Sequence, residues 1–159
     1  MGVNTVQSHV KTLLNGLTIP NYREPLATYI TPPNPGKLPG PACYVWATAG
    51  NNHRQTMPRG AGFRETTWGV SIWLMAPGIA TDPLSDVKFA GLIDTVINAL
   101  VTDTMPIFET DSVTGQQYQL LSIGEEFTVQ QSPVHALSDQ RLLLFEALID
   151  LTVKEATSP

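Results

Sequence analysis

Apolar residues near the start of the chain follow a helical period. Five of them recur at steps of three and four residues: Val6, Val10, Leu13, Leu14 and Leu17. This spacing predicts a helix over residues 5–15 with one apolar side. Asn4 can accept hydrogen bonds from the first turn, and Gly16 suits the left-handed residue that often closes a helix.

A longer apolar stripe begins near residue 84 and predicts the principal helix, which continues to about residue 101. Its members are Leu84, Val87, Leu92, Ile93, Val96, Ile97 and Leu100. Asp82 followed by Pro83 favours a helix start at this point, because aspartate caps a helix and proline is tolerated in the first turn.

Four other stretches have the character of strands. Residues 42–48 form the first, and residues 63–75 follow a two-residue period, with Trp68, Val70, Ile72 and Leu74 on one face, until the turn-forming sequence at 75–78 ends them. Residues 117–130 and 140–154 are a second pair. In 117–130 the apolar positions shift from even to odd numbers, which predicts a bulge before or near Gly124.

The strands carry apolar residues on the side opposite their main apolar rows as well. We expect these residues to cover a contact between subunits, because tryptophan and leucine bury large areas there. They are Trp46, Trp73, Leu142, Leu144 and Leu148.

Two segments do not fit a helix or a strand. Residues 32–41 hold five prolines and two glycines, which predicts an extended strap. Residues 49–62 are rich in turn-forming and basic residues and predict a long loop.

The whole pattern predicts one domain over residues 1–159 of the α+β class, a mixed or antiparallel sheet of four to five strands with two helices packed on one face. Segments 26–31 and 107–110 are candidates for additional edge strands.

The charge content restricts the partners. Only 14% of the residues are charged, and the net charge is −5. Average soluble domains have roughly 25% charged residues, so sparse charge suggests surface covered by a partner. The negative balance argues against general attraction to nucleic acid or anionic lipid. No apolar run is long enough to cross a bilayer as a helix, and we expect no membrane partner.

Catalytic and cofactor motifs are missing from the sequence. Neither a phosphate-binding loop nor a metal-binding spacing occurs, and the three histidines, at 9, 53 and 135, are isolated. We therefore expect no catalytic set, no cofactor and no metal. One alternative is a small hydrolase or ligand-binding domain in which Cys43 acts as a nucleophile and His53 as its base. A small buried thiol inside a strand is the commoner explanation for Cys43.

The predicted loop has one functional-looking feature, a set of basic residues with no acid before Glu65: His53, Arg54, Arg59 and Arg64. Arginines spaced in this way suit a phosphate or carboxylate partner, because the guanidinium group donates forked hydrogen bonds. Positive charge also keeps an exposed loop soluble, and both interpretations remain open.

The order of segments resembles the tail terminator proteins of long-tailed bacteriophages. The similarity covers nearly the whole chain: a short N-terminal helix, a proline-rich approach to the strand Ala42–Trp46, a return strand over 64–74, a helix opened by Asp82 and Pro83, and a last strand ending at Val153. The proline-rich strap and the predicted loop are longer than the shortest members of that family need.

This resemblance implies a homo-hexameric ring in the virion, assembled in the host cytoplasm. The ring caps the completed tail tube, stops its polymerisation and offers a surface to neck or head-completion proteins. It further implies that the 49–62 loop contacts the tube or lines the channel through which DNA passes. A neck or head–tail joining protein of the same virion is the alternative within this class.

The two halves of the chain differ in charge. Residues 1–81 hold six lysines and arginines and two acids, a net charge of +4, whereas residues 82–159 hold three and twelve, a net charge of −9. Such polarity predicts either a ring with one positive and one negative surface, or complementary sides that meet between neighbouring subunits.

Overall fold

The computed structural model describes residues 2–34, 37–56, 62–79, 84–101, 107–110, 117–131, 135–136 and 142–157. The elements in chain order are α1 (Gly2–Leu14), β1 (Ala27–Tyr29), β2 (Ala42–Thr56), β3 (Gly62–Ile79), α2 (Ser85–Val101), β4 (Ile107–Thr110), β5 (Gln117–Gln131), β6 (His135–Ala136) and β7 (Leu142–Thr157). The predicted α+β class, with two helices and a mixed sheet, is confirmed.

The two halves of the chain form different parts of the sheet. Its strand order is β1-β2-β3-β7-β5-β4, and β6 adds to β7 beside this path. Only β1 and β2 pair in parallel, and the other pairs are antiparallel. The four long strands are the expected ones, and β1 and β4 are the two edge strands that the sequence suggested. Residues before α2 thus build one side of the sheet, and residues after it build the other.

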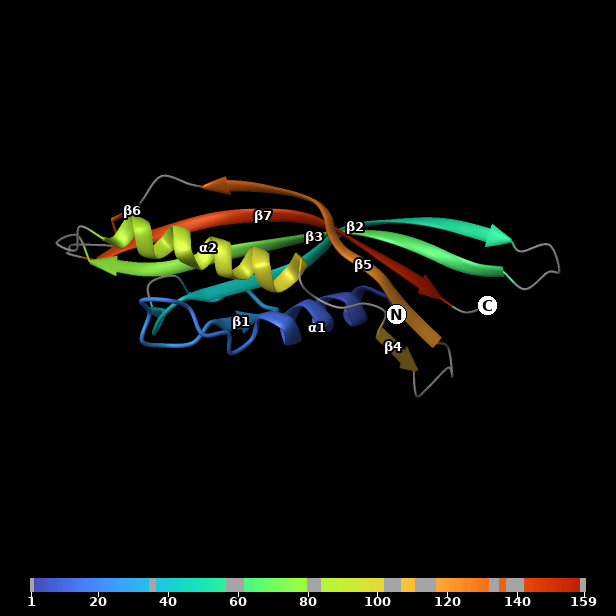
Figure 1. Ribbon diagram of the computed structural model, residues 1–159, viewed down its shortest axis with the longest axis horizontal. Helices are drawn as coiled ribbons and strands as arrows, with labels where there is room; N and C mark the ends of the chain where they lie inside the picture. Colours follow the sequence, from blue (N-terminus) through green and yellow to red (C-terminus); the bar gives the residue numbers. More distant parts are fainter. Residues whose placement is uncertain are drawn as a thin grey trace.

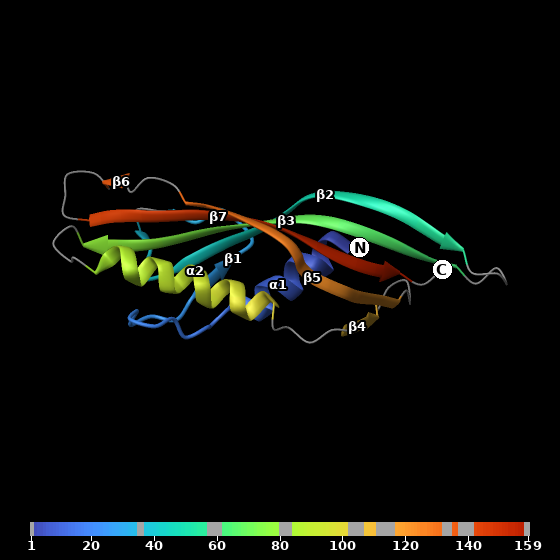
Figure 2. The same ribbon diagram turned by 45° about the horizontal axis from the view of Figure 1, so that its top comes forward.

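Both helices pack on the same face of the sheet, as predicted (Figures 1 and 2). Val6, Val10 and Leu14 of α1 are fully buried in the core together with Phe89 and Leu92 of α2. The strand residues in this core alternate along β2, β3 and β7: Cys43, Val45, Val70, Ile72, Leu74, Ala76, Phe145, Ala147, Ile149, Leu151 and Val153. The helical period of α1 and α2 and the two-residue period of the strands therefore meet in one apolar layer.

The first helix ends as the sequence predicts but begins earlier. Gly16 has a φ of 80°, the left-handed conformation that glycine adopts without strain. Its N–H donates to the carbonyl of Leu26 at 2.8 Å, and the N–H of Leu26 donates to Leu17 at 2.9 Å. This pair of bonds turns the chain back toward β1. Because α1 starts at Gly2, Asn4 lies inside the helix and not at its N-cap.

The prediction of a loop over residues 49–62 is wrong for residues 49–56 and for residue 62. β2 continues to Thr56, β3 begins at Gly62, and their pairing is unbroken from Ala49↔Gly69 to Thr56↔Gly62. Polar and glycine-containing segments have weak intrinsic strand preference, but pairing with a neighbouring strand overrides it. Residues 57–61 lie outside the described residues.

We call the extended part of this hairpin, residues 49–56 of β2 and 62–67 of β3, the arm. It reaches past the ends of both helices (Figure 1). At its other end β3 continues past the turn that was predicted at residues 75–78, since Pro77 and Ile79 still pair with β7. β2 pairs with β3 only as far as Met75, so Pro77 lies at a sheet edge, where proline is tolerated.

The predicted irregularity in residues 117–130 is confirmed. The register between β5 and β7 shifts between Leu120 and Ser122 and again between Ile123 and Phe127. The second shift contains Gly124, as expected for a bulge that bends a strand.

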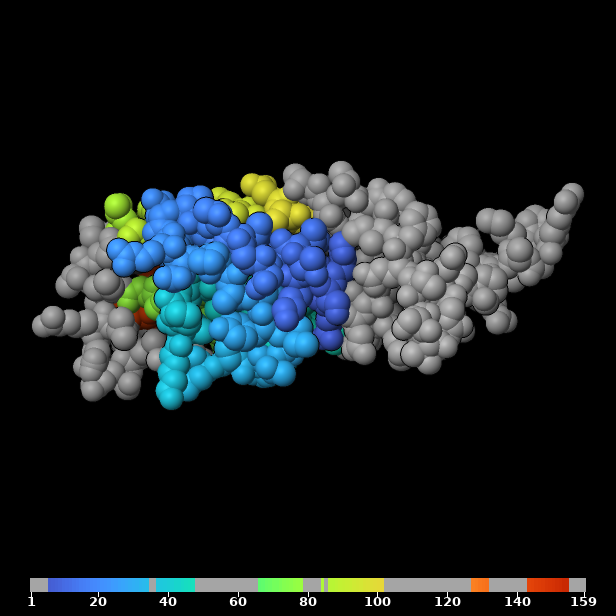
Figure 3. Space-filling model, turned by 90° about the horizontal axis from the view of Figure 1, so that it is seen from below, coloured from blue at the N-terminus to red at the C-terminus, as the bar shows by residue number. Residues whose placement is uncertain are grey.

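The described part of the proline-rich strap, residues 32–34 and 37–41, contains no strand and only one 3-10 turn, in which the N–H of Lys37 donates to the carbonyl of Asn34 at 3.1 Å. Leu38 packs against a second, smaller apolar cluster formed by Ala42, Met75 and Leu144. The N–H of Ala27 donates to the carbonyl of Pro41 at 3.1 Å, which fixes the end of the strap beside β1. Figure 3 shows α1 and the segment that follows it as one continuous surface. The predicted helix start at Asp82 and Pro83 lies outside the described residues, and α2 itself begins at Ser85.

Candidate interaction face

The face of the sheet opposite the helices carries a compact set of aromatic and acidic residues. Two rows of register partners cross it. Tyr44, Trp73 and Leu148 form one row, and Trp46, Ser71 and Asp150 form the next. Neither α1 nor α2 packs on this side of the sheet. We define the aromatic face by six residues: Tyr44, Trp46, Trp73, Glu146, Leu148 and Asp150.

Hydrogen bonds fix the two carboxylates of the aromatic face. The indole Nε1 of Trp73 donates to Glu146 Oε2 at 3.1 Å, and the buried hydroxyl of Ser71 donates to Asp150 Oδ1 at 2.5 Å. Asp150 is exposed and Glu146 is half-buried. Both carboxylates therefore remain accessible while their orientation is fixed. This lowers the entropy cost of ordering them when a partner binds.

The aromatic rings add a flat apolar surface next to these acids. The rings of Tyr44 and Trp46 stack with centroids 4.7 Å apart and an interplanar angle of 23°. Both residues are half-buried, as is Trp73. Large amphipathic rings beside carboxylates are suited to a cationic partner, because the ring face and the carboxylate both attract positive charge.

The structure places three of the five expected subunit-contact residues on this face. Trp46, Trp73 and Leu148 are half-buried there. Leu144 belongs to the same side, but it is only 3% exposed in the small cluster with Leu38 and is not free for a partner. Leu142 pairs with Ile79 at the start of β7, and its side chain lies outside the described residues.

The arm brings two of the four expected basic residues together. Arg54 of β2 and Arg64 of β3 are direct register partners, and His53 is the partner of Glu65. Like charges at directly opposed positions destabilise a strand pair, so this arrangement favours an anionic or carboxylate partner. β7 pairs with this part of β3, and its Glu155, the register partner of Thr66, lies two positions along the sheet from Arg64. Arg59 lies outside the described residues.

Cys43 and His53 do not lie close together in the structure. Both residues belong to β2, ten residues apart, which separates them by about 33 Å at the rise of a strand. Cys43 is fully buried, and its thiol donates to Thr28 Oγ1 at 3.4 Å. Burial raises the pKa of the Cys43 thiol to about 11, although the bond to Thr28 opposes this shift. A thiol with this pKa is a poor nucleophile at neutral pH.

The other candidate groups do not gather into a chemical site. His9 is buried on α1 and does not belong to a cluster of ligating groups within the described part of the chain. Among the described residues, no three His, Cys, Asp or Glu side chains lie close enough together to hold a metal ion. In the same part of the chain, neither helix has the length and apolar character needed to span a membrane.

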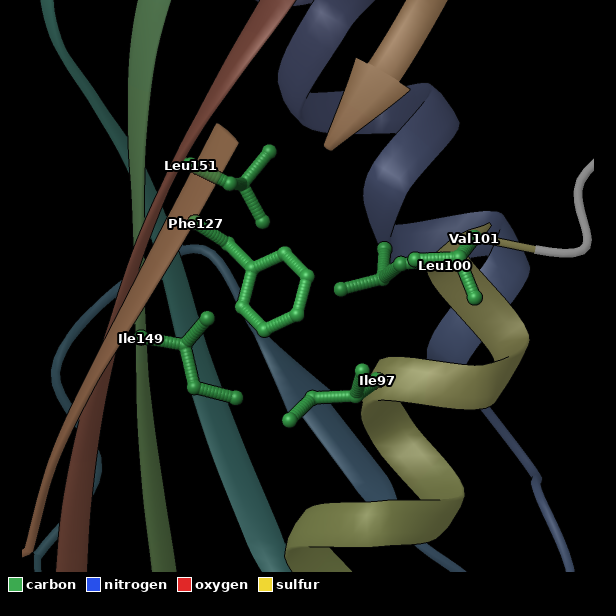
Figure 4. A pocket seen from close by; sticks show the side chains of 6 residues that line it. All are labelled: Ile97, Leu100, Val101, Phe127, Ile149 and Leu151. Carbon is green, nitrogen blue, oxygen red and sulfur yellow. The ribbon is translucent and has the colours of Figure 1, made fainter. Parts of the chain in front are cut away.

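An apolar recess that the sequence does not predict lies between α2 and β5 (Figure 4). Its volume is about 200 Å³ including space open to solvent, and its lining is Ile97, Leu100, Val101, Phe127, Ile149 and Leu151. Phe127 is 43% exposed, and the neighbouring Val129 is 39% exposed. The only sequence signal is that Phe127 and Val129 keep the core-facing parity on a strand that α2 does not reach far enough to cover.

No protein-family model matches this chain, and no curated protein matches its sequence.

Proposed function

We propose that this protein is a structural component of a phage virion, a tail terminator. Copies join into a closed ring, a homo-hexamer by the family resemblance, that caps the tail tube and stops its polymerisation. The ring then receives the neck or head-completion protein at the head–tail joint. Assembly takes place in the host cytoplasm, and no catalytic chemistry or cofactor takes part.

The observation that carries this proposal is the division of charge across the sheet. Strands β1, β2 and β3 and helix α1 come from the half of the chain with net charge +4, and β7, β5, β4 and α2 come from the half with net charge −9. The two sides of one molecule are thus electrostatically complementary. Complementary but different sides favour head-to-tail contacts, which generate closed rings when the rotation between copies closes.

The aromatic face also supports an assembly role. Tyr44, Trp46 and Trp73 are half-buried on the side of the sheet that carries no helix, and Tyr44 and Trp73 pack against the small cluster that Leu38 of the strap also contacts. Exposed aromatic residues are typical of protein interfaces. The separation of Cys43 and His53 removes the specific residue pair on which the hydrolase or ligand-binding alternative was based.

The tube, or DNA in the ring channel, is the partner that the resemblance implies for the arm. Replacing Arg54, Arg59 and Arg64 with Ala tests this role, because tail joining or DNA passage then falls while the ring persists. Unchanged assembly of infectious particles by the triple variant would show that these arginines serve neither contact.

The functional test adds the purified protein to tail tubes and images their ends. A terminator binds one end of each tube and halts further growth of that end. Binding to the head or neck complex without binding to tubes would instead identify the alternative within this class, a neck or head–tail joining protein. Binding to neither structure contradicts a virion role.

A further inference from the structure

The arm and the aromatic face of this chain are complementary, but they cannot meet within one molecule. Both belong to the same continuous sheet: β2 and β3 carry the arm at one end and Tyr44, Trp46 and Trp73 toward the other. A strand cannot fold back onto its own sheet without breaking that pairing. Any contact between arm and aromatic face therefore joins two molecules.

We propose that the arm of one copy docks on the aromatic face of the next copy. This inference rests on the proposed ring and names the surfaces that form it. Arg54 and Arg64 of the arm provide the positive side, and Glu146 and Asp150 of the next copy provide the negative side. The tube or DNA channel implied by the resemblance is a competing partner for the same arginines.

The register of the arm supports this contact. Arg54 and Arg64 are direct register partners, and the part of the sheet that carries them extends past both helices (Figure 2). Neither α1 nor α2 covers that part, so it can stack on another sheet, at the spacing of about 10 Å at which sheets pack face to face. A second copy supplies such a sheet.

The chemistry of the aromatic face matches two arginines. Glu146 and Asp150 lie on the same side of β7, one on each side of Leu148, and each is oriented by a hydrogen bond from β3. Arginine pairs with carboxylates through forked hydrogen bonds and stacks on aromatic rings, and the stacked pair of Tyr44 and Trp46 lies in the same rows.

Other charges on this side of the sheet are compatible with the contact. Lys154 also has the parity of the aromatic face, but it lies four residues past Asp150 toward the arm end of β7 and already has an interaction of its own. Thr128 and Gln130 of the adjacent β5 are the register partners of Asp150 and Leu148, and they bring no further charge to these rows.

The test uses two charge-reversed variants of the full chain. The arm variant carries Arg54→Glu and Arg64→Glu, and the face variant carries Glu146→Lys and Asp150→Lys. Like-charge contacts cost several kcal/mol, so each variant alone should associate about 100-fold more weakly than the unaltered protein, as measured by sedimentation velocity. In a mixture, the acidic arm of the arm variant matches the basic face of the face variant. The unaltered basic arm of the face variant likewise matches the unaltered acidic face of the arm variant. An equimolar mixture should therefore recover assembly, with the two variants alternating around a ring of even number.

Two single variants are matched controls. Arg23→Glu and Asp94→Lys reverse exposed charges outside the arm and the aromatic face, and they should leave association unchanged. If the face variant does not fold, Glu146→Gln with Asp150→Asn removes the charge and retains an acceptor for Ser71. This milder pair should weaken association without abolishing it.

The outcomes separate the inference from the proposed function. If the unaltered protein forms a ring and either variant alone forms it equally well, the inference is wrong and the ring stands. If the arm variant still forms a ring but no longer binds tail tubes or DNA, the arm belongs to those partners and the inference is wrong. If the unaltered protein forms no ring, alone or on tubes, the proposed function fails as well.

Discussion

The reactivity of Cys43 gives a quantitative test of the buried core on which the interaction face is built. Cys43 is the only cysteine, so a thiol reagent reports on one position. Its side chain is fully buried, and burial raises its pKa from 9.0 to about 11. A shift of two pH units lowers the thiolate fraction at pH 8 by about 100-fold, and the reagent also needs a local opening of the core.

We therefore expect the folded protein to react with a maleimide at least about 100-fold more slowly than the urea-unfolded chain at pH 8. The measurement is the mass of the labelled chain as a function of time. A folded protein that reacts within tenfold of the unfolded chain would refute the burial of Cys43. It would also reopen a nucleophilic role for this residue.

The same shift predicts a loss of stability at high pH. Because the pKa of Cys43 is higher in the folded state than its value of 9.0 in the unfolded chain, the neutral thiol stabilises the fold fully below pH 9. That stabilisation falls between pH 9 and about 11 and amounts to about 3 kcal/mol at most. Burial also raises the pKa of Tyr22, to about 12, so the control must retain Tyr22.

Cys43→Ala is this control, because it removes the thiol and leaves the tyrosine in place. Its unfolding free energy should fall less steeply between pH 9 and 11 than that of the unaltered protein, as measured by urea titration. Identical pH slopes for the two proteins would contradict the assigned shift.

Two further predictions concern packing and the aromatic face. A Cβ at Gly78 would collide with the ring of Phe145, so Gly78→Ala should destabilise the protein by about 1–3 kcal/mol. Gly91→Ala has open space on helix α2 and should stabilise it by up to about 1 kcal/mol, and equal effects of the two substitutions in thermal unfolding would show that the Gly78 contact is wrong. Trp73→Phe removes the indole hydrogen bond to Glu146 and should cost about 1 kcal/mol, since the bond is only partly buried. A double-mutant cycle with Glu146→Gln measures this coupling, and a value of zero would show that Trp73 does not orient Glu146.

The sequence predicts the layers of this fold well, because each layer depends on a local period. Ile149 and Leu151 face the core and Leu148 faces the other side, as two-residue alternation requires. The closing conformation of Gly16 follows from glycine's tolerance of positive φ in the same local way.

The features that the sequence analysis missed depend on distant neighbours. Residues 49–56 look like a loop by composition, but β3 supplies a complete set of partners and extends β2 to Thr56. The recess near Phe127 exists because of where α2 ends relative to β5, which no local pattern encodes.

The aromatic face could be predicted from the sequence only in part. Alternation placed Trp46 and Trp73 on it correctly. The two hydrogen bonds that hold Glu146 and Asp150 depend on the register between β3 and β7, which brings together residues more than 70 positions apart. Sequence patterns can therefore locate the face but not the arrangement of its carboxylates.

The central claim is that copies of this chain close into a ring through unlike sides. Native mass spectrometry over a range of protein and salt concentrations, with and without tail tubes, tests it most directly. The account predicts one closed species at six times the 17.3 kDa chain that forms less readily as salt screens the charged contacts. A strict monomer in every condition, tube ends included, or an open-ended series of growing oligomers would contradict it.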